Sequence, residues 1–401
     1  MEQALPLFDS VKEVLEFNKN VISRPFFVYR PHSIRQAVQA FKHLKAQKLF
    51  AVKTNPNPWV IHDIYHSGIT SFDVASLTEI QQIRESFPDA ELFYMHPVKS
   101  RHSIREAYFN YKVKHYSLDS EAELQKILTE TQHANDLGLH MRIDIPNNYA
   151  ELGLAGKFGV NLQDAAELLK KIALHAHKIG ICFHVGSQCM HPDAYRIAIR
   201  IAAEVLKNAG INIDYFNIGG GFPSIYPGMN PPALAAYFEA IHEEFSNIPN
   251  FQNMQLLAEP GRAIVAESMS LIAKVDLRKR NELYINEGTY GSLFDAGIPK
   301  FVFPVKLICD REIHSTDLAA FSFYGPTCDS LDYMEGPFYL PSDINEGDYI
   351  EIGQLGAYGQ TMSSRFNGFS AEKDLFIVTN EPLMSMYGNS QESYNQIEHA
   401  S

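Results

Sequence analysis

Residues 115–145 read HYSLDSEAELQKILTETQHANDLGLHMRIDI, and this stretch contains the alternation from which the fold is predicted. It contains two short β-rich runs, HYSLD (115–119) and LHMRIDI (139–145), on either side of the helical pattern SEAELQKILTETQ. Within that pattern Leu124, Ile127 and Leu128 recur at helical intervals, and Ser120 and Glu123 have the spacing of a capping box. The stretch therefore predicts a strand, a helix and a second strand in succession.

The same alternation extends from about residue 30 to 265. Six further β-rich runs separate amphipathic stretches: KLFAVK (48–53), SFDVAS (71–76), ELFYMH (91–96), GICFHVGS (180–187), YFNIGGGF (215–222) and LLAEP (256–260). Eight strands with seven helix-sized connections are the count of a closed (β/α)8 barrel. A doubly wound open sheet is the competing α/β architecture, and periodicity alone does not exclude it.

After about residue 265 the rhythm changes. The remaining sequence is β-rich, with proline and glycine punctuation and few helical periods, as in FVFPVKLICD and GDYIEIGQLGAYG. We therefore expect a barrel over residues 26–265. A second, mostly antiparallel β-domain is expected from residues 266–401, together with residues 1–25.

Composition narrows the class of protein. The chain has 401 residues, 45% of them hydrophobic and 20% charged, which is ordinary for a globular protein. Its formal charge of −13 argues against nucleic-acid binding, and no apolar run is long enough to span a bilayer. The N-terminus does not resemble a signal peptide. The 4 cysteines lack metal-ligand spacing, so we expect reduced thiols, no metal and a cytoplasmic location.

Polar and glycine residues stand at the ends of the predicted barrel strands, where barrels of this kind collect their functional groups. They are Lys53, Asp73, Arg142, His184, Ser187, Gly219, Gly220, Gly221, Glu259, Gly261 and Arg262. A strand-end lysine or a GGG turn is commonplace by itself. Together, a lysine, a glycine and arginine cradle for phosphate, and a carboxylate for a ring nitrogen are what pyridoxal 5′-phosphate (PLP) requires.

Three other features carry chemistry. Glu79 follows Ser76 at capping-box spacing, so a capping role and a site role are equally open. The segment GPTCDSLD (325–332) sets Cys328 beside Asp329, a potential proton donor next to a carboxylate. In GAYG (356–359), Tyr358 stands in a glycine-flanked turn from which its hydroxyl could reach a phosphate.

Together these motifs resemble the fold-type III PLP-dependent decarboxylases, the group that contains eukaryotic-type ornithine decarboxylase and diaminopimelate decarboxylase. The resemblance rests on FAVKTNPNP, SFDVASLTE, MRID, KFGV, FHVGSQ, NIGGGFP, EPGR, GPTCDSLD and GAYG, in the order that the family uses. It implies that Lys53 holds PLP covalently, that Glu259 pairs with the pyridine nitrogen and that His184 stacks on the ring. The phosphate would be bound by Ser187, Gly219, Gly220, Gly221, Gly261, Arg262 and Tyr358, with Asp73 and Arg142 in support.

The resemblance also implies a homodimer with shared active sites. The GPTCDSLD loop would reach the site of the partner subunit, where Cys328 would protonate the carbanion left by CO2. Asp329 would bind the distal amine of the substrate, and Tyr290 and Phe366 would line the same shared site.

The Cys–Asp pair favours a small amino-acid substrate with a simple terminal ammonium, so L-ornithine, giving putrescine for polyamine biosynthesis, is the first expectation. L-Lysine, or both substrates, is the main alternative, because the segment from Tyr290 to the possible substrate contact Asp295 is shorter than in eukaryotic ornithine decarboxylases. Decarboxylation of diaminopimelate, carboxynorspermidine or arginine is less favoured. A catalytically inactive regulatory homologue is the non-enzyme alternative. An amino-acid racemase would not carry the Cys–Asp loop.

Overall fold

The computed structural model describes residues 6–17, 24–153, 156–309, 315–369 and 373–387. The chain forms two compact units. One, which we call the barrel unit, comprises residues 41–223 and 231–263. The other, the β-unit, comprises residues 1–40, 224–230 and 264–401, and each unit is described by itself.

The barrel unit is a closed parallel barrel, so the barrel prediction is confirmed over the open sheet. Its strand order is β11-β12-β3-β4-β5-β6-β7-β9. The strands are β3 (Gln47–Ala51), β4 (Ser71–Val74), β5 (Glu91–Tyr94), β6 (His115–Leu118), β7 (Gly138–Arg142), β9 (Lys178–Cys182), β11 (Tyr215–Asn217) and β12 (Gln255–Ala258). Each of the eight strands begins within its predicted β-rich run or one to two residues before it. The runs are easy to recognise because a strand buried on both faces consists mostly of consecutive apolar residues.

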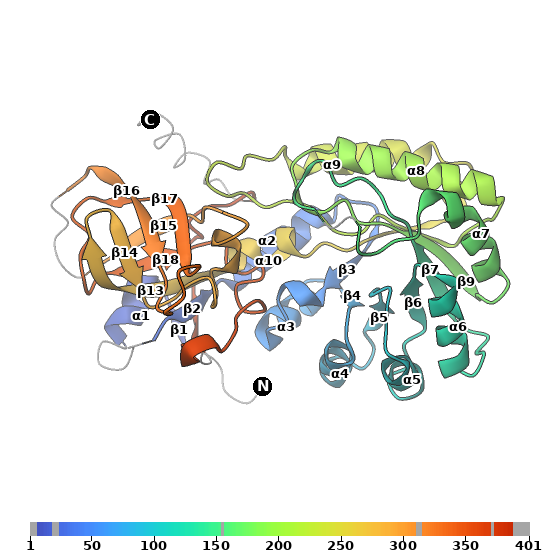
Figure 1. Cartoon of the computed structure of the whole chain (residues 1–401), viewed down its shortest axis with the longest axis horizontal. Coiled ribbons are helices and arrows are strands. Elements are labelled where there is room, and N and C mark those ends of the chain that lie inside the picture. The colour runs from blue at the N-terminus through green and yellow to red at the C-terminus, as the bar shows by residue number, and fades with distance from the viewer. Residues whose placement is uncertain (1–5, 18–23, 154–155, 310–314, 370–372, 388–401) are drawn as a thin grey trace. The chain divides into compact units, whose positions relative to one another are not determined.

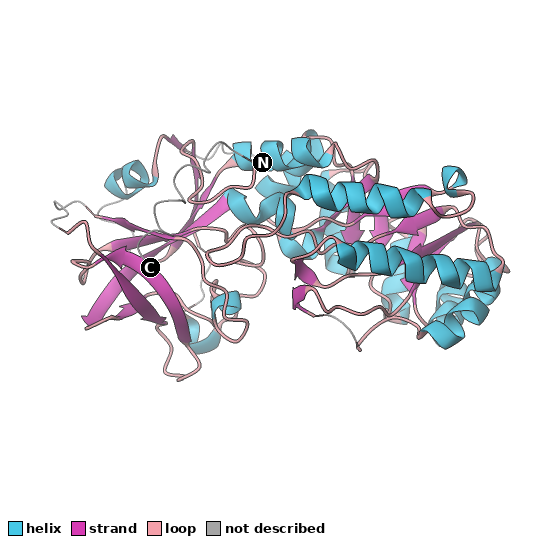
Figure 2. Ribbon diagram, turned by 90° about the horizontal axis from the view of Figure 1, so that it is seen from above, coloured by secondary structure: helices cyan, strands magenta, loops and turns pink. Residues whose placement is uncertain are grey.

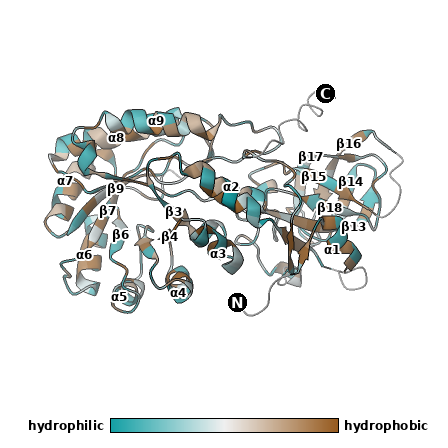
Figure 3. Cartoon of the chain, turned by 180° about the vertical axis from the view of Figure 1, so that it is seen from behind, coloured by the Kyte–Doolittle hydropathy of each residue, from teal (hydrophilic) through white to brown (hydrophobic). Residues whose placement is uncertain are grey.

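Helices surround this barrel (Figure 1). They are α3 (Pro58–His66), α4 (Leu77–Ser86), α5 (Arg101–Phe109), α6 (Glu121–Glu130), α7 (Leu162–Ala173), α8 (Asp193–Ala209) and α9 (Leu234–Ser246). The view from above shows the helices outside the strands, and the hydropathy colouring shows that helices such as α8 carry polar and apolar residues together (Figures 2 and 3). Such two-sided helices bury one face on the barrel and leave the other to water. In the described ranges no helix is both long and apolar enough to cross a membrane.

Side-chain caps fix where several helices begin. Ser76 accepts a hydrogen bond from the N–H of Glu79 at the start of α4, and Ser120 does the same for Glu123 at the start of α6. The predicted reciprocal bond of Glu123 is not made, because its carboxylate instead accepts the backbone N–H of Lys99 at 3.1 Å and lies 3.0 Å from the Lys99 ammonium. Glu123 therefore binds Lys99, in the segment after β5, and does not complete the capping box.

The β-unit is built on a nine-stranded sheet with the main order β1-β19-β2-β13-β14-β16-β17, and β18 joins β15 to β13. Its strands are β1 (Leu7–Phe8), β2 (Phe26–Tyr29), β13 (Met269–Lys279), β14 (Glu282–Ile285), β15 (Val305–Ile308), β16 (Leu318–Tyr324), β17 (Tyr333–Pro341), β18 (Tyr349–Ile352) and β19 (Leu375–Val378). Most of the pairings are antiparallel, as predicted.

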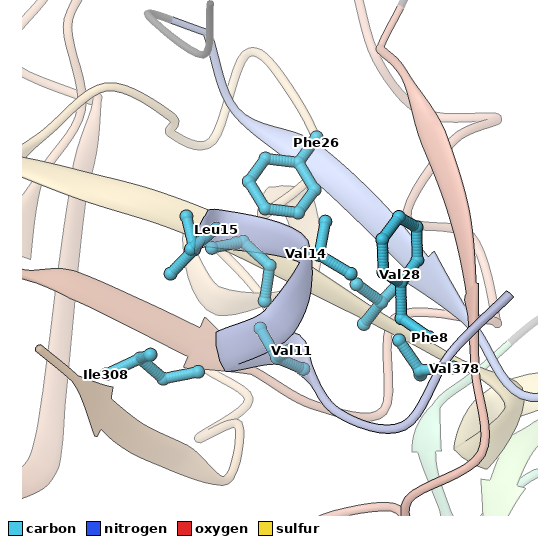
Figure 4. Close-up of a cluster of buried hydrophobic side chains, with 9 residues drawn as sticks. Phe8, Val11, Val14, Leu15, Phe26, Val28, Ile308 and Val378 are labelled. Atoms are coloured by element: carbon cyan, nitrogen blue, oxygen red, sulfur yellow. The ribbon is translucent and has the colours of Figure 1, made fainter. Parts of the chain in front are cut away.

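The first strands of the chain belong to this sheet. β2 pairs with β13 and β19, whereas the sequence boundary at residue 26 assigns it to the barrel. The helix α1 (Val11–Phe17) packs over the same sheet, and Figure 4 shows the apolar cluster that joins them. This cluster comprises Phe8, Val11, Val14, Leu15, Phe26, Val28, Ile272, Ile308 and Val378. Its members range from Phe8 to Val378, so early and late segments of the described chain share one core.

Candidate active site

Lys53 lies just beyond the first barrel strand, in a 3-10 turn (Val52–Thr54) and not in the strand itself as predicted. Its Nζ is 3.7 Å from Oδ2 of Asp73 on the neighbouring strand β4, and its side chain is 45% exposed while that of Asp73 is buried. Burial raises the pKa of Asp73, and the positive charges of Lys53 and Arg142 oppose that rise. The lysine amine is therefore open to a ligand and held by a carboxylate.

Glu259 follows β12 and forms the second buried carboxyl of this region. Asn217, the last residue of β11, donates from Nδ2 to Oε1 of Glu259 at 2.7 Å. Burial raises the pKa of Glu259 to about 7; the charge of Asp73 adds to the rise and that of Lys53 opposes it. A buried carboxyl of this kind is stabilised as an anion by a cationic hydrogen-bond donor, which the protonated ring nitrogen of PLP would supply.

The glycine run 219–221 forms a tight backbone cradle after β11. Gly219 has φ +67°, and a side chain there would lie 2.1 Å from the carbonyl oxygen of Phe183. Its N–H is already bound by Oδ1 of Asn217 at 2.9 Å. In the described part of the chain, the N–H groups of Gly220 and Gly221 have no protein acceptor. Gly219 therefore shapes the turn, while the next two residues present donors to an anion.

The EPGR segment brings two more phosphate candidates into place. Arg262, which is buried, points Nε at Oγ of Ser187 at 3.4 Å. A Cβ on Gly261 would lie 2.2 Å from Oγ1 of Thr54, so only glycine lets this segment approach the turn that carries Lys53. The sequence-predicted residues at the ends of β3, β9 and β12 are thereby brought together.

His184 lies in the loop after β9, whereas the prediction placed it within a strand. Its Nδ1 accepts the N–H of Gly186 at 3.0 Å, so the neutral ring carries its proton on Nε2. Burial lowers the pKa of His184 well below its ordinary value, and the charges of Lys53 and Arg142 add to that effect. A neutral flat ring at this position can stack on an aromatic cofactor.

Glu79 serves as a cap and also belongs to this cluster. Its Oε2 accepts the N–H of Ala75 at 2.7 Å. Burial raises the pKa of Glu79 to about 7; the hydrogen bond from Ala75 opposes the rise, and Asp73 adds to it. The capping contact is therefore present, and a role of Glu79 in the site stays a prediction.

In the β-unit, Tyr290, Asp329 and Phe366 form one cluster. The hydroxyl of Tyr290 donates to Oδ2 of Asp329 at 2.6 Å, and the N–H of Leu331 donates to Oδ1 at 3.0 Å. These two hydrogen bonds hold the pKa of Asp329 below its ordinary value. The rings of Tyr290 and Phe366 are 4.7 Å apart. Asp329 is thus a half-buried, oriented anion suited to a cationic group.

Asp332 ties the two loops of this cluster to each other. Its buried carboxylate accepts four hydrogen bonds of 2.7–3.1 Å, from the N–H and the hydroxyl of Thr289 and of Thr327. Thr289 precedes Tyr290, and Thr327 precedes Cys328. One carboxylate therefore sets the spacing between the tyrosine and the Cys–Asp pair.

The other predicted residues of the β-unit lie in separate turns. Asp295 is buried in a 3-10 turn, Phe294–Ala296. Tyr358 is half-buried after β18, with a left-handed φ of +63°. Cys328 is exposed and contacts the side chain of Asn367.

Three residues that support the site escaped the sequence prediction: Asn217, Asp332 and Asn367. Asn217 stands two residues before Gly219, the first glycine of the GGG run, Asp332 ends GPTCDSLD and Asn367 follows Phe366. Asn217 could have been predicted, because it is a polar residue at the end of an apolar strand. The other two are revealed only by contacts with distant segments.

Known proteins resemble this chain over most of its length. The family model described as pyridoxal-dependent decarboxylase, pyridoxal binding domain, matches residues 31–266. A lysine/ornithine decarboxylase of Selenomonas ruminantium is 31% identical over 372 residues, covering 90% of this chain and 91% of that protein. An ornithine decarboxylase of Schizosaccharomyces pombe is 32% identical over 360 residues, covering 84% and 78%. The arginine decarboxylase of Paramecium bursaria Chlorella virus, solved with agmatine, has a TM-score of 0.80 at 26% identity and covers 92% of this chain and 99% of its own.

Proposed function

Because the chain belongs to the family of pyridoxal-dependent decarboxylases, we propose that it converts L-ornithine to putrescine and CO2. Relatives named lysine/ornithine, ornithine and arginine decarboxylase support a PLP-dependent enzyme that decarboxylates a basic amino acid. The observation that carries the choice of substrate is Asp329, a half-buried carboxylate held as an anion beside Cys328. It can receive the distal ammonium of a diamino acid.

The hydrogen bonds of Asp329 favour an ammonium over the other basic groups. Each of its oxygens already accepts one protein donor, so a single-point ammonium contact fits better than the two-point clamp that a guanidinium prefers. Diaminopimelate carries a second carboxylate, which Asp329 would repel. L-Lysine differs from ornithine by one methylene and is the second candidate, supported by the dual name of the Selenomonas relative.

The cofactor roles follow from the residues at the end of the barrel. Lys53 would hold PLP covalently, and Asp73, 3.7 Å from its Nζ, would hold the amine as an ammonium whenever it is free. Glu259 would bind the ring nitrogen and His184 the ring face. When bound, PLP supplies an electron sink for the pair left on Cα as CO2 departs. We assign the phosphate to Ser187, Gly220, Gly221, Gly261, Arg262 and Tyr358, with Gly219 shaping the cradle.

Glu259 would also control the protonation state of the ring nitrogen of PLP. Burial raises the pKa of Glu259 to about 7 even though the charges of Lys53 and Arg142 oppose the rise. A protonated ring nitrogen brought next to it would favour the carboxylate and be favoured by it in return. Asn217 keeps the carboxylate pointed in one direction. Glu259 would therefore keep the ring nitrogen protonated.

We further propose a homodimer in which Cys328 and Asp329 complete the active site of the partner subunit. The support is the exposed apolar surface on the same segments of the β-unit. Leu331 is 64% exposed, Phe369 49%, Met362 42% and Phe366 40%. Large apolar side chains gathered near a functional loop are typical of a surface that another chain covers.

Subunit mixing tests the dimer. Lys53→Ala and Cys328→Ala proteins are each expected to make little amine, because one lacks the cofactor lysine and the other the proton donor. After mixing, roughly a quarter of wild-type activity is expected from random reassortment of a two-site dimer. No gain on mixing, with dimers present by gel filtration, would contradict shared sites.

Substrate choice is tested directly. The PLP-loaded protein is incubated separately with ornithine, lysine, arginine and meso-diaminopimelate, and CO2 and amine are quantified. A larger kcat/KM for ornithine supports the proposal. A larger value for lysine or arginine would overturn ornithine and leave the decarboxylase, whereas bound PLP with no CO2 from any substrate would favour the non-enzyme alternative.

A further inference from the structure

Asn367 makes two contacts with Cys328, although 39 residues separate them in the chain. Its Oδ1 accepts the backbone N–H of Cys328 at 3.3 Å and lies 3.4 Å from the sulfur. A backbone N–H can only donate, so the amide end that faces Cys328 must be the oxygen and not the NH2 group. The same oxygen can accept the thiol proton but has no proton of its own to give.

The turn that carries Asn367 is itself fixed. Asn367 has left-handed backbone angles, φ +52° and ψ +9°, which asparagine tolerates better than most residues. The ring of Phe366 packs on that of Tyr290, and Ser364 donates to the carbonyl of Tyr290 from both its N–H and its hydroxyl at 2.8 and 2.9 Å. Because this carbonyl belongs to the residue whose hydroxyl binds Asp329, the thiol and the carboxylate share one frame.

We propose that Asn367 is a positioning residue for proton delivery by Cys328: its amide oxygen holds the sulfur in one place and the thiol proton on it. The inference rests on the proposed role of Cys328. In that step the S–H bond breaks, a Cα–H bond forms at the substrate, the sulfur keeps the electron pair, and solvent later returns a proton to the thiolate. Asn367 takes no part in bond making.

Loss of this positioning has a chemical signature. If the proton reaches the aldehyde-derived carbon of the cofactor in place of Cα, hydrolysis yields an aminoaldehyde and pyridoxamine phosphate, with the electron pair retained in the aminated cofactor. CO2 is released in either case. The ratio of aldehyde to amine therefore reports where the proton went, while total CO2 reports whether the earlier steps survive.

The experiment compares Asn367→Gly, which removes the amide without backbone strain, with Asn367→Asp, which keeps an acceptor oxygen. Asn250→Gly is the matched control, because Asn250 is also exposed and left-handed, with φ +61°, and its side chain makes no capping bond. The first readout needs no cofactor: the rate at which iodoacetamide alkylates Cys328 in the apoprotein at fixed pH, followed by peptide mass spectrometry. The second is the aldehyde-to-amine ratio of the PLP-loaded dimer with the best substrate.

We expect Asn367→Gly to raise both the alkylation rate and the aldehyde ratio by about five- to tenfold, the worth of one neutral hydrogen bond. Asn367→Asp keeps the acceptor and adds a negative charge that disfavours the thiolate, so it should raise neither the alkylation rate nor the aldehyde ratio, and Asn250→Gly should be unchanged. Unaltered alkylation in Asn367→Gly, or an unaltered product ratio, would overturn the proposal. A loss of CO2 equal to the loss of amine would also overturn it, since that is the result of a purely structural role. If wild type releases no CO2, the proposed function fails, and the alkylation rates still decide the contact.

Discussion

Replacement of Glu79 by glutamine is expected to make the protein more stable at alkaline pH than at acidic pH, relative to wild type. Glutamine is isosteric and retains an acceptor for the N–H of Ala75, so the cap at the start of α4 survives. What changes is the charge. Burial, with Asp73 nearby, raises the pKa of Glu79 from 4.5 to about 7.

The sign follows from the direction of that shift. A carboxyl whose native pKa is raised binds more protons folded than unfolded, so its stabilising effect is complete below pH 4.5 and is lost as pH rises through 7. The whole shift corresponds to about 3 kcal/mol of unfolding free energy, of which about 2 kcal/mol falls between pH 5.5 and pH 8.5. The advantage of Glu79→Gln over wild type should therefore grow by about 2 kcal/mol across this interval.

Urea denaturation of the apoproteins at four or five pH values measures this difference. The matched control is Glu85→Gln, which removes an equal charge from an exposed position on the same helix. Other titrating groups cancel in the comparison because they are common to all three proteins. If the difference in unfolding free energy between Glu79→Gln and wild type changes with pH by less than about 0.5 kcal/mol, the usual size of a surface effect, burial does not raise the pKa of Glu79.

Two further predictions concern the glycine cradle and the substrate loop. Gly219→Ala should lower the unfolding free energy by at least about 2 kcal/mol, because its Cβ would lie 2.1 Å from the carbonyl oxygen of Phe183. The control is Gly210→Ala: Gly210 has φ +66° with open space around it, so this variant should lose about 1 kcal/mol through left-handed backbone strain alone. Equal losses would show that the close approach is unimportant. Tyr290→Phe removes the hydroxyl that orients Asp329 at 2.6 Å, so the KM for ornithine should rise roughly fivefold in steady-state assays with kcat changed less, as for loss of one hydrogen bond. An unchanged KM would show that the hydrogen bond from Tyr290 to Asp329 does not contribute to substrate binding.

The barrel could be predicted from sequence because each strand is a short apolar run that ends in a polar or glycine residue. Those endings also gathered most of the candidate site, since parallel strands in a barrel deliver their carboxyl ends to one face. The errors within the barrel concerned the exact residues at which single strands end. Lys53 follows β3 in a 3-10 turn, and a run of letters such as KLFAVK does not show where extended backbone gives way to a turn.

Contacts between distant segments could not be predicted in the same way. Asn367 meets Cys328 across 39 residues, and Asp332 meets Thr289 across 43. No local period encodes such pairings, because they depend on how loops of the β-unit close on one another. The domain boundary at residue 26 was wrong for a related reason: FFVY was not among the predicted strands, and only its partner β13, some 240 residues later, reveals which sheet it joins.

The pairing of β2 with β13 and β19 has a consequence for the order in which the molecule forms during synthesis. Residues 41–223 emerge from the ribosome as a nearly continuous barrel sequence, whereas the four buried residues of β2 wait for partners that are translated last. Until β13 and β19 have been translated, the apolar strand β2 lacks its partners, a state that favours association with chaperones or with other chains. Completion of the β-unit is the final event, and it is the unit on which the Cys–Asp loop depends.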